Sequence, residues 1–478
     1  MNNYAATLLY AVLCFGLLAL PAFAKPKPVS TEGLSPSGNG VPPMTDTTIA
    51  WPQILREIQE MGAHLGQGVN SRMTYFPLGQ LGVIGTGVNG DGILVCGIQK
   101  QARTGIQLYD RIFAVNGVRL DSAREDEDFT LRILGKELDK AGAADSVLKL
   151  KVIRVERGGK NPKELTLDLP IKARGSFGDT NPQLTEKAKA LNNVAAAAYI
   201  KAKVETTGDW PAMFGSYMCG IGLLGSESEE GLRSLASVMD LIEQRHASAK
   251  VIHEGKLNIK TWYVSMATIF AAEYYWATGD EKAFRTLETL ADYLNGFFTV
   301  DGTTGHRRQS AMYNSDNFAA PCGLALLAMT VAEKAGVAVN LKTIDTIFTH
   351  YGPPELQGAK ESNKNSVSYG GRLESRQAGA GAQSAFRTAT VMMAAHLRDQ
   401  FPYTRKAMGD YLASTIPYHM NTHATPSLGE YFGCLAIGLN DFGSIPKLVA
   451  YKAPKLTLSW DCNDDVQYMP SLAGKSKG

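Results

Sequence analysis

The chain carries almost no excess charge of either sign. Among its 478 residues, 48 Lys and Arg nearly balance 46 Asp and Glu, which leaves a formal net charge of +2. Proteins that bind nucleic acid usually concentrate basic side chains on one surface, and this composition indicates no such surface. With 44% hydrophobic and 20% charged residues, most of the chain is expected to fold into globular domains, roughly two or three at this length.

Cysteine is scarce too, and this excludes a small scaffold held together by disulfides. The chain has six cysteines, and the first lies in the apolar leader described below. The others are an odd number, so at least one thiol is unpaired or pairs between chains. Three of them lie in apolar helical patterns, where a thiol acts as a small hydrophobic group. The set is Cys96, Cys219, Cys322, Cys434 and Cys462, and its pairing stays open.

Several catalytic motifs are missing. A serine protease needs a nucleophile on a sharp glycine-rich turn beside its base, and the sequence contains no Gly-Asn-Ser-Gly stretch and no Gly-x-Ser-x-Gly elbow leading into a predicted helix. His419 and His423 have the i, i+4 spacing of zinc ligands, but the Glu that follows the first His in a zinc protease is absent. Residues 461–465 contain Asp and Cys without a partner at a fixed spacing. We therefore expect neither a metal nor a cofactor.

The first 24 residues have the pattern of a signal peptide. Residues 8–20 form an uncharged apolar core, and Ala22-Phe23-Ala24 supplies a small-residue cleavage pattern. The first four residues contain no Lys or Arg, so an uncleaved anchor is the alternative. We expect cleavage, no membrane span afterwards, and a periplasmic, cell-envelope or extracellular location. Residues 25–48, rich in Pro, Gly, Ser and Thr, are predicted to be a disordered linker.

Short strands and glycine turns occupy the region from about residue 68 to 173. Residues 147–155 alternate apolar and polar side chains over much of their length, as do residues 163–169, and Gly158-Gly159 between them predicts a hairpin. One helix is expected at 122–140, with acidic residues in its first turns, where the helix dipole favours them. This region is therefore predicted to be a small β domain with one helix.

From residue 184 onward the pattern is almost entirely helical. The expected helices include 259–277, 281–298, 317–334, 382–397 and 427–439. Three helix starts are alike, because each has a Gly beside a Cys, followed by small and branched apolar residues. Small residues let helices approach closely, so we predict a closed array of helical hairpins with small-residue inner helices. The three starts are Cys219-Gly220, Cys322-Gly323 and Gly433-Cys434.

The β region resembles a PDZ domain over residues 78–172. The stretch from Gly105 to Gly117 is similar to the family's signature of glycine, leucine, Gly-Asp, Ile and Val-Asn-Gly, with Tyr109 in place of the glycine before Asp110. Residues 78–84 match the family's peptide-binding loop, which captures a C-terminal carboxylate on backbone N–H groups. The peptide-binding residues that this resemblance implies are Leu78, Gly79, Leu81, Gly82 and Val83.

The whole arrangement resembles an uncharacterised family of secreted bacterial proteins that join a PDZ domain to an α/α-toroid, the fold of terpenoid cyclases and prenyltransferases. The resemblance rests on residues 175–182, Thr261-Trp262-Tyr263, residues 273–280 and Gly305-His306-Arg307. It implies a multidomain α+β protein: a PDZ-like domain with a preceding short helix over 51–174, a toroid over 183–460 and a tail over 461–478. It implies no activity, because this fold serves several chemistries.

Polar and aromatic residues precede several expected inner helices, and a toroid would bring them to one mouth. Trp and Tyr stack on sugars, Arg binds a uronate or sulfate, and His, Tyr, Asp or Glu transfer protons. This set predicts a cleft that binds an acidic polysaccharide, with a glycan lyase or glycoside hydrolase as the enzymatic form. The catalytic candidates are His306, Tyr313, Asp316, Tyr369, Arg372, His423 and Glu430, and the substrate-binding candidates are Trp210, Trp262, Tyr263, Arg307, Asn317 and Glu374.

Two alternative functions stay open. In one, the protein is a non-catalytic envelope scaffold that binds protein C-termini through the PDZ-like domain. In the other, the helical domain is a terpenoid-cyclase-like enzyme, which requires an enclosed apolar cavity and is excluded by a polar, open cleft. Polar and aromatic residues at helix starts are also common caps and packing residues, so an inert helical domain is the baseline for each hypothesis.

Overall fold

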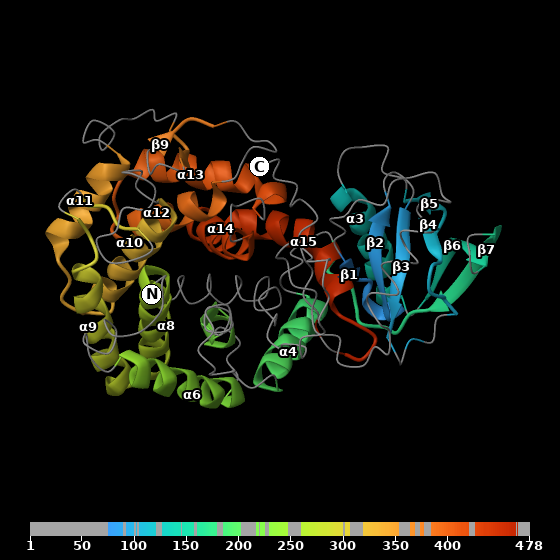
Figure 1. Cartoon of the computed structure of the whole chain (residues 1–478), viewed down its shortest axis with the longest axis horizontal. Coiled ribbons are helices and arrows are strands. Elements are labelled where there is room, and N and C mark those ends of the chain that lie inside the picture. The colour runs from blue at the N-terminus through green and yellow to red at the C-terminus, as the bar shows by residue number, and fades with distance from the viewer. Residues whose placement is uncertain are drawn as a thin grey trace, which may run out of the picture. The chain divides into compact units, whose positions relative to one another are not determined.

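Figure 1 shows the structure, a computed structural model of the chain, with its helices and strands labelled. The predicted signal peptide, the linker and the short helix that follows them lie outside the described residues. Within the described part, no helix combines the length and the apolar character needed to span a membrane. The structure describes residues 75–88, 92–99, 102, 105–120, 127–144, 146–156, 160–178, 185–201, 217–218, 220–224, 229–246, 260–299, 302–305, 319–352, 364–368, 373–376, 384–419, 426–464 and 466.

The described residues divide into two compact units. The sheet unit holds those up to 198 together with those from 449 onward, and the helical unit holds those between 199 and 448. An antiparallel sheet region is thus followed by a mostly helical region, which confirms the predicted α+β class. This division differs at both ends from the helical domain expected over 183–460, because residues 185–198 and 449–460 fall in the sheet unit.

The sheet unit is built on an antiparallel sheet of order β1-β2-β3-β4-β6-β7, with β5 paired to β4. In β6 the predicted alternation is present: Leu148, Leu150 and Val152 are buried, whereas Lys149 and Lys151 are exposed. Buried leucines of α3 close the same core. The elements are β1 (Tyr75–Pro77), β2 (Val83–Val88), β3 (Gly92–Ile98), β4 (Arg111–Val115), β5 (Val118–Arg119), α3 (Glu127–Ala143), β6 (Val147–Glu156), β7 (Lys160–Pro170) and α4 (Glu186–Lys201).

Asp110 anchors the turn that leads into β4. Its buried carboxylate accepts hydrogen bonds from Nε (2.8 Å) and Nη2 (2.7 Å) of Arg154, and a third from the backbone N–H of Gln107. These three charge-assisted bonds offset the cost of burying the carboxylate. Tyr109 has a φ of 71°, a left-handed conformation that favours glycine, so the departure from glycine noted in the sequence places a strained residue here.

The C-terminal segment completes the core of the sheet unit. α15 (Ile445–Ser459) lies against α3, where the carbonyl oxygen of Pro454 is so close to Gly135 that a Cβ there would overlap it. Leu458 has no exposed surface and belongs to the same hydrophobic cluster as the strands. Burying a leucine fully contributes about 2 kcal/mol, so this segment helps to stabilise the sheet unit.

Arg174 binds the segment that follows α15. Its guanidinium donates to the carbonyl oxygens of Trp460 (3.0 Å) and Asp461 (2.6 Å) and pairs with the carboxylate of Asp464 at 2.5 Å. The same group lies 4.4 Å from the ring centroid of Trp460. A planar guanidinium can make this combination of contacts, whereas a lysine ammonium cannot. Lys172 adds a second ion pair to Asp464 at 2.7 Å.

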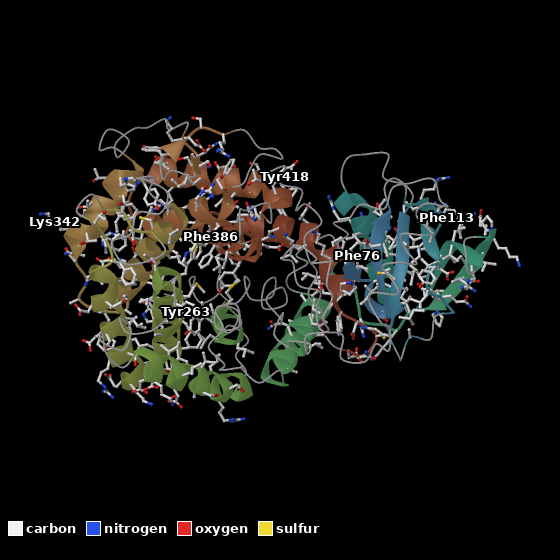
Figure 2. The ribbon with its side chains drawn as sticks, viewed as in Figure 1. Phe76, Phe113, Tyr263, Lys342, Phe386 and Tyr418 are labelled. Carbon is white, nitrogen blue, oxygen red and sulfur yellow. The ribbon has the colours of Figure 1, made fainter. Side chains whose placement is uncertain are left out.

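The helical unit alternates apolar helices with amphipathic ones. We call α8, α10, α12 and α14 the inner helices; they pack against one another in that order, and α9, α11 and α13 pack beside them. Tyr263 on α8 and Phe386 on α12 lie inside the unit, whereas Lys342 on α11 points outward (Figure 2). The elements are α6 (Glu229–His246), α8 (Lys260–Thr278), α9 (Glu281–Asn295), α10 (Ala319–Lys334), α11 (Leu341–Tyr351), β8 (Ser366–Val367), β9 (Leu373–Glu374), α12 (Ala385–Leu397), α13 (Pro402–Ser414) and α14 (Pro426–Asn440).

Two glycines of the repeated helix starts lie in close contact with a side chain of a neighbouring helix. A Cβ on Gly323 of α10 would stand 2.6 Å from Oγ1 of Thr390 on α12, and a Cβ on Gly220 would overlap the ring of Phe270 on α8. Interiors packed this densely cannot absorb an added methyl group without shifting their neighbours. The close approach of helices that the small residues predict is therefore present at both positions.

The variant Gly135→Ala tests the packing of the C-terminal segment on α3. Replacing glycine by alanine inside a helix normally stabilises it by about 1 kcal/mol, but here the new Cβ would overlap the carbonyl of Pro454. We expect Gly135→Ala to destabilise the sheet unit by about 1–3 kcal/mol, measured by hydrogen exchange of the β6 and β7 amides.

The matched control for this variant is Gly142→Ala in the same helix. A Cβ at Gly142 would have its nearest neighbour at 3.6 Å, an ordinary contact. This variant should be neutral or stabilising. If both variants stabilised the unit equally, Pro454 would not lie over Gly135 in solution.

Candidate functional site

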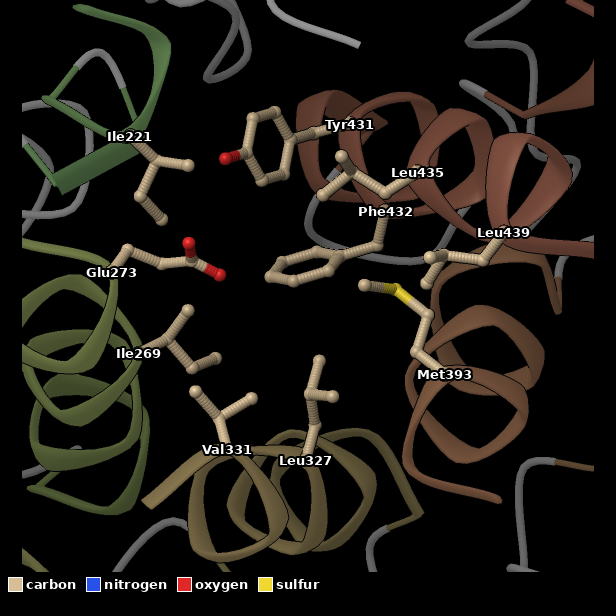
Figure 3. A pocket seen from close by; sticks show the side chains of 10 residues that line it. All are labelled: Ile221, Ile269, Glu273, Leu327, Val331, Met393, Tyr431, Phe432, Leu435 and Leu439. Carbon is tan, nitrogen blue, oxygen red and sulfur yellow. The ribbon is translucent and has the colours of Figure 1, made fainter. Parts of the chain in front are cut away.

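A pocket lies among the inner helices of the helical unit (Figure 3). It contains about 420 Å³ not filled by protein atoms, including space open to solvent. Among the described residues, most of the lining is apolar, and Glu273 and Tyr431 are its polar side chains. The apolar lining residues are Ile221, Ile269, Leu327, Val331, Met393, Phe432, Leu435 and Leu439.

The helical repeat explains why these side chains meet. Residues four apart lie on one face of a helix, so a pocket between helices is lined by residues at that spacing. Three of the inner helices contribute such sets, and Met393 of α12 completes the ring. The sets are Ile269 and Glu273 from α8, Leu327 and Val331 from α10, and Tyr431, Leu435 and Leu439 from α14.

Glu273 provides the one carboxyl group among the lining residues that the structure describes. Its carboxylate is directed into the pocket from α8, and the hydroxyl of Tyr431 faces the same space from α14 (Figure 3). The residue is only 9% exposed. The rings of Tyr431 and Phe432 meet edge to face, with centroids 5.0 Å apart and an interplanar angle of 86°. One side of an otherwise apolar pocket thus combines a carboxylate with two aromatic rings.

Glu430, predicted to be catalytic, lies next to the pocket but is not part of its lining. It precedes Tyr431 on α14 and is only 1% exposed. Neighbouring residues on a helix point about 100° apart, and on α14 the pocket is lined by Tyr431 and Phe432 but not by Glu430. The helix therefore turns Tyr431, and not Glu430, toward the pocket.

The aromatic residues predicted to stack on sugars are buried in packing. Trp262 is 4% exposed and stacks on Phe386, with ring centroids 5.6 Å apart and 14° between the planes. Phe386 in turn contacts Phe432 at 5.4 Å. Tyr263 is 1% exposed. Trp262 therefore packs on Phe386, which contacts the pocket residue Phe432. Its ring is buried and is not open to a sugar.

Glu374 lies in the short β8–β9 hairpin, where it is half-buried and forms an ion pair with Arg376. It does not line the pocket. The remaining predicted glycan-site residues lie outside the described residues: His306, Tyr313, Asp316, Tyr369, Arg372, His423, Trp210, Arg307 and Asn317.

The loop predicted to bind a peptide carboxylate is covered by the chain itself. Leu78, Leu81 and Val83 are at most 2% exposed, and Gly79 and Gly82 are buried. The C-terminal segment supplies part of this cover: a Cβ on Gly79 would meet the carbonyl oxygen of Thr457 at 2.8 Å, and one on Gly82 would meet Sγ of Cys462 and Cβ of Ala102, each at 2.8 Å.

Three backbone N–H groups of this loop already donate hydrogen bonds to other backbone atoms. The N–H groups of Leu78, Leu81 and Gly82 donate to the carbonyl oxygens of Val83, Leu78 and Gly79, at 2.9, 3.3 and 3.0 Å. β2, which follows the loop, pairs with β1 on one side and β3 on the other. A peptide that adds a strand needs an open sheet edge, and a carboxylate needs unused N–H groups. Residues 84–86 of β2 are paired on both sides, so they offer no open edge.

His419, one of the two histidines with zinc-like spacing, has a packing role. It is fully buried, and its Nε2 lies 2.9 Å from the carbonyl oxygen of Leu412, which can only accept a hydrogen bond. Nε2 therefore carries the proton, and Nδ1 faces Sγ of Cys434 at 4.0 Å. Among the described residues, no group of three or more His, Cys, Asp or Glu side chains could hold a metal ion.

The cysteines predicted to pack as small hydrophobic groups are buried where the structure describes them. Cys322 and Cys434 are at most 2% exposed, and Cys96 is fully buried, which raises the pKa of its thiol well above the ordinary value. Cys462 is half-buried beside Gln99, with Sγ 3.0 Å from Oε1. Cys219 lies outside the described residues.

Glu273 was missed as a site residue in the sequence, although a signal for it exists there. It stands in the helix with Ile269 one turn before it, and the preceding residues from 261 to 272 contain no charged side chain. A lone acid on the buried face of an apolar helix is rare unless it has a partner or a function. The glycan hypothesis directed attention to helix starts, whereas Glu273 lies near the end of α8.

Peptide binding can be tested directly on the full-length protein. Because the loop is covered and three of its N–H groups are already bonded, we expect peptides with free C-terminal carboxylates and their amidated counterparts to bind equally weakly. Fluorescence anisotropy with labelled peptides of apolar C-terminal sequence measures the difference. A preference of about tenfold or more for the free carboxylate would mean that the C-terminal segment leaves the loop in solution.

Comparisons with known proteins bear on the helical region. No curated protein and no solved structure matches the chain at a significant level. A family model described as a domain of unknown function, DUF6288, matches residues 189–441, more than half of the chain. The match covers all the inner helices and every residue that lines the pocket. The chain belongs to the DUF6288 family.

Proposed function

We propose that the helical unit binds a largely apolar small molecule in the pocket between the inner helices. The observation that supports this most is the lining: among the described residues, eight apolar side chains surround the space, together with one carboxyl group and one phenol. Small-molecule sites in proteins are usually mostly apolar clefts of about 300–1,000 Å³ with a few placed polar groups. The described lining has this composition.

This proposal differs from the acidic-polysaccharide hypothesis in the chemistry of the ligand. A sugar needs many hydrogen-bonding partners, because each buried hydroxyl without one costs free energy. An acidic sugar would also bring its carboxylate toward that of Glu273, and like charges repel. Most residues behind the glycan hypothesis lie outside the described part of the chain, so it stays a prediction from sequence.

The terpenoid-cyclase-like alternative is the one that the lining favours, because it requires an apolar cavity. Aromatic rings such as those of Tyr431 and Phe432 attract positive charge, and a carboxyl group such as Glu273 can donate or accept a proton. These are suitable residue types for work on an apolar substrate. The proposal is limited to binding, and turnover is a separate question for assay.

The finer fold assignments are also proposals. We propose that the sheet unit is a PDZ-like domain, supported by the turn Asn116-Gly117 between β4 and β5, where both residues have positive φ as a tight hairpin turn requires. We propose that the helical unit is an α/α-toroid, supported by the alternation of inner and covering helices. The N-terminal leader supports an envelope or extracellular location.

Binding is tested with a neutral apolar dye, N-phenyl-1-naphthylamine, whose fluorescence rises on entering an apolar site. We expect the full-length protein to bind it at micromolar concentration and Val331→Phe to weaken binding at least about tenfold, because the larger ring fills the pocket. Leu341→Phe, at an exposed position on α11, is the matched control and should bind like the wild type. Equal binding by all three proteins would place the dye elsewhere.

A further inference from the structure

The sheet unit carries part of its own C-terminal region on a sheet that is complete without it. All seven strands of the sheet come from residues 75–170, and residues 454–464 contribute no strand to it. We propose that the surface under residues 454–464, which we call the docked segment, is a binding site for a polypeptide, and that the docked segment is its resident and exchangeable ligand. The inference concerns the sheet unit and is independent of the pocket in the helical unit.

Two glycines form the part of the site that receives the backbone of the docked segment. A Cβ on Gly79 would lie 2.8 Å from the carbonyl oxygen of Thr457 and 3.2 Å from Cα of Leu458. A Cβ on Gly135 of α3 would overlap the carbonyl of Pro454. Since a side chain at either glycine would displace this backbone, the surface is shaped to the close approach of a main chain. The side chain of Leu458 then enters the hydrophobic cluster of the sheet unit.

Arg174 binds the docked segment where α15 ends. Its guanidinium donates to the carbonyl oxygens of Trp460 and Asp461, and it lies 4.4 Å from the ring centroid of Trp460. The bonds to carbonyl oxygens recognise a main chain of any sequence, whereas the contact with the ring selects an aromatic side chain. One arginine therefore fixes both the path of the backbone and the type of one residue.

Two aspartates give the docked segment charges that match those of the site. Asp464 pairs with Lys172 at 2.7 Å and with Arg174 at 2.5 Å. Oδ2 of Asp461 accepts a hydrogen bond from Nε2 of Gln99 at 3.0 Å. Together with the leucine and the tryptophan, these contacts define the partner that fits the site: a polypeptide with the spacing Leu-x-Trp-Asp-x-x-Asp.

The contact has the composition of an interface between two chains. Leu458 and the glycines form an apolar centre, and an ion pair lies at the rim, where 46% of the Asp464 side chain and 66% of the Lys172 side chain are exposed. Protein–protein interfaces have this arrangement. The hydrogen-bonded residues are 286 to 363 positions apart, so the site and its ligand are separate in the chain, as two binding partners are.

The experiment cuts the full-length chain and measures whether the docked segment exchanges. A protease recognition sequence is inserted between Phe442 and Gly443, in a turn whose residues 441–443 are exposed, and the folded chain is cleaved there. A fluorescein-labelled peptide of residues 445–466 is then added in excess. We expect fluorescence anisotropy to show that the cleaved chain takes up the peptide with a micromolar or lower Kd.

The uncut chain with the same insertion is the control. Its docked segment stays covalently attached, which keeps it at an effective concentration in the millimolar range. The uncut chain should therefore bind the labelled peptide at least about tenfold more weakly than the cleaved chain.

Changes made in the peptide leave the protein itself unaltered. Trp460→Ala removes the ring that lies on Arg174, and we expect the Kd to rise about tenfold or more. Asp464→Asn removes both ion pairs, and because these are partly exposed we expect a rise of about three- to tenfold. Lys447→Gln, at an exposed position, is the matched charge control and should bind like the unchanged peptide.

Three results would overturn the inference. If the cleaved chain takes up no peptide unless denaturant unfolds the sheet unit, the docked segment is an integral part of the core. If a peptide of scrambled sequence binds equally well, the site does not recognise this pattern. If Trp460→Ala and Asp464→Asn both bind as tightly as the unchanged peptide, the contacts named above do not hold the ligand. Dye binding to the helical unit is a separate measurement, so none of these results bears on the proposed function.

Discussion

Burial of the inner helices is the constraint on which the helical unit depends. α8, α10, α12 and α14 carry apolar side chains around most of their circumference, and such helices are stable only when they are covered on nearly every side. Each inner helix packs on its neighbours, and α9, α11 and α13 lie beside them. The pocket remains where the side chains of four inner helices and Ile221 meet without filling the space. It is a consequence of the same packing that stabilises the unit.

Glu273 is an exception to this pattern, because it places a carboxyl group at a buried position of an apolar inner helix. A helix selected only for packing would carry Leu or Met at such a position, because replacing a buried charged group by an apolar one of similar volume is often neutral or stabilising. The carboxyl group is nevertheless directed into the apolar space, opposite two aromatic rings. That arrangement supports the proposed binding of a small molecule in the pocket.

The sheet unit depends on a different kind of contact, between residues far apart in the chain. Arg174 binds the backbone at Trp460 and Asp461, and Leu458 enters the hydrophobic cluster formed by strands more than 280 positions earlier. The same segment covers the loop from Leu78 to Gly82. The residues that would make this domain a receptor for foreign C-termini are thus used to bind the chain's own C-terminal segment.

The sequence by itself determined the local elements. The helices expected at 259–277 and 317–334 are found as α8 (Lys260–Thr278) and α10 (Ala319–Lys334), and the alternation of β6 matches its burial. Helical and strand periodicity are local properties, so they can be read from neighbouring residues. Only the tertiary structure decided that Glu273 faces the pocket while Glu430 does not, and that residues 449–466 complete the sheet unit. Both outcomes depend on which faces meet across long sequence separations, and no local pattern encodes that.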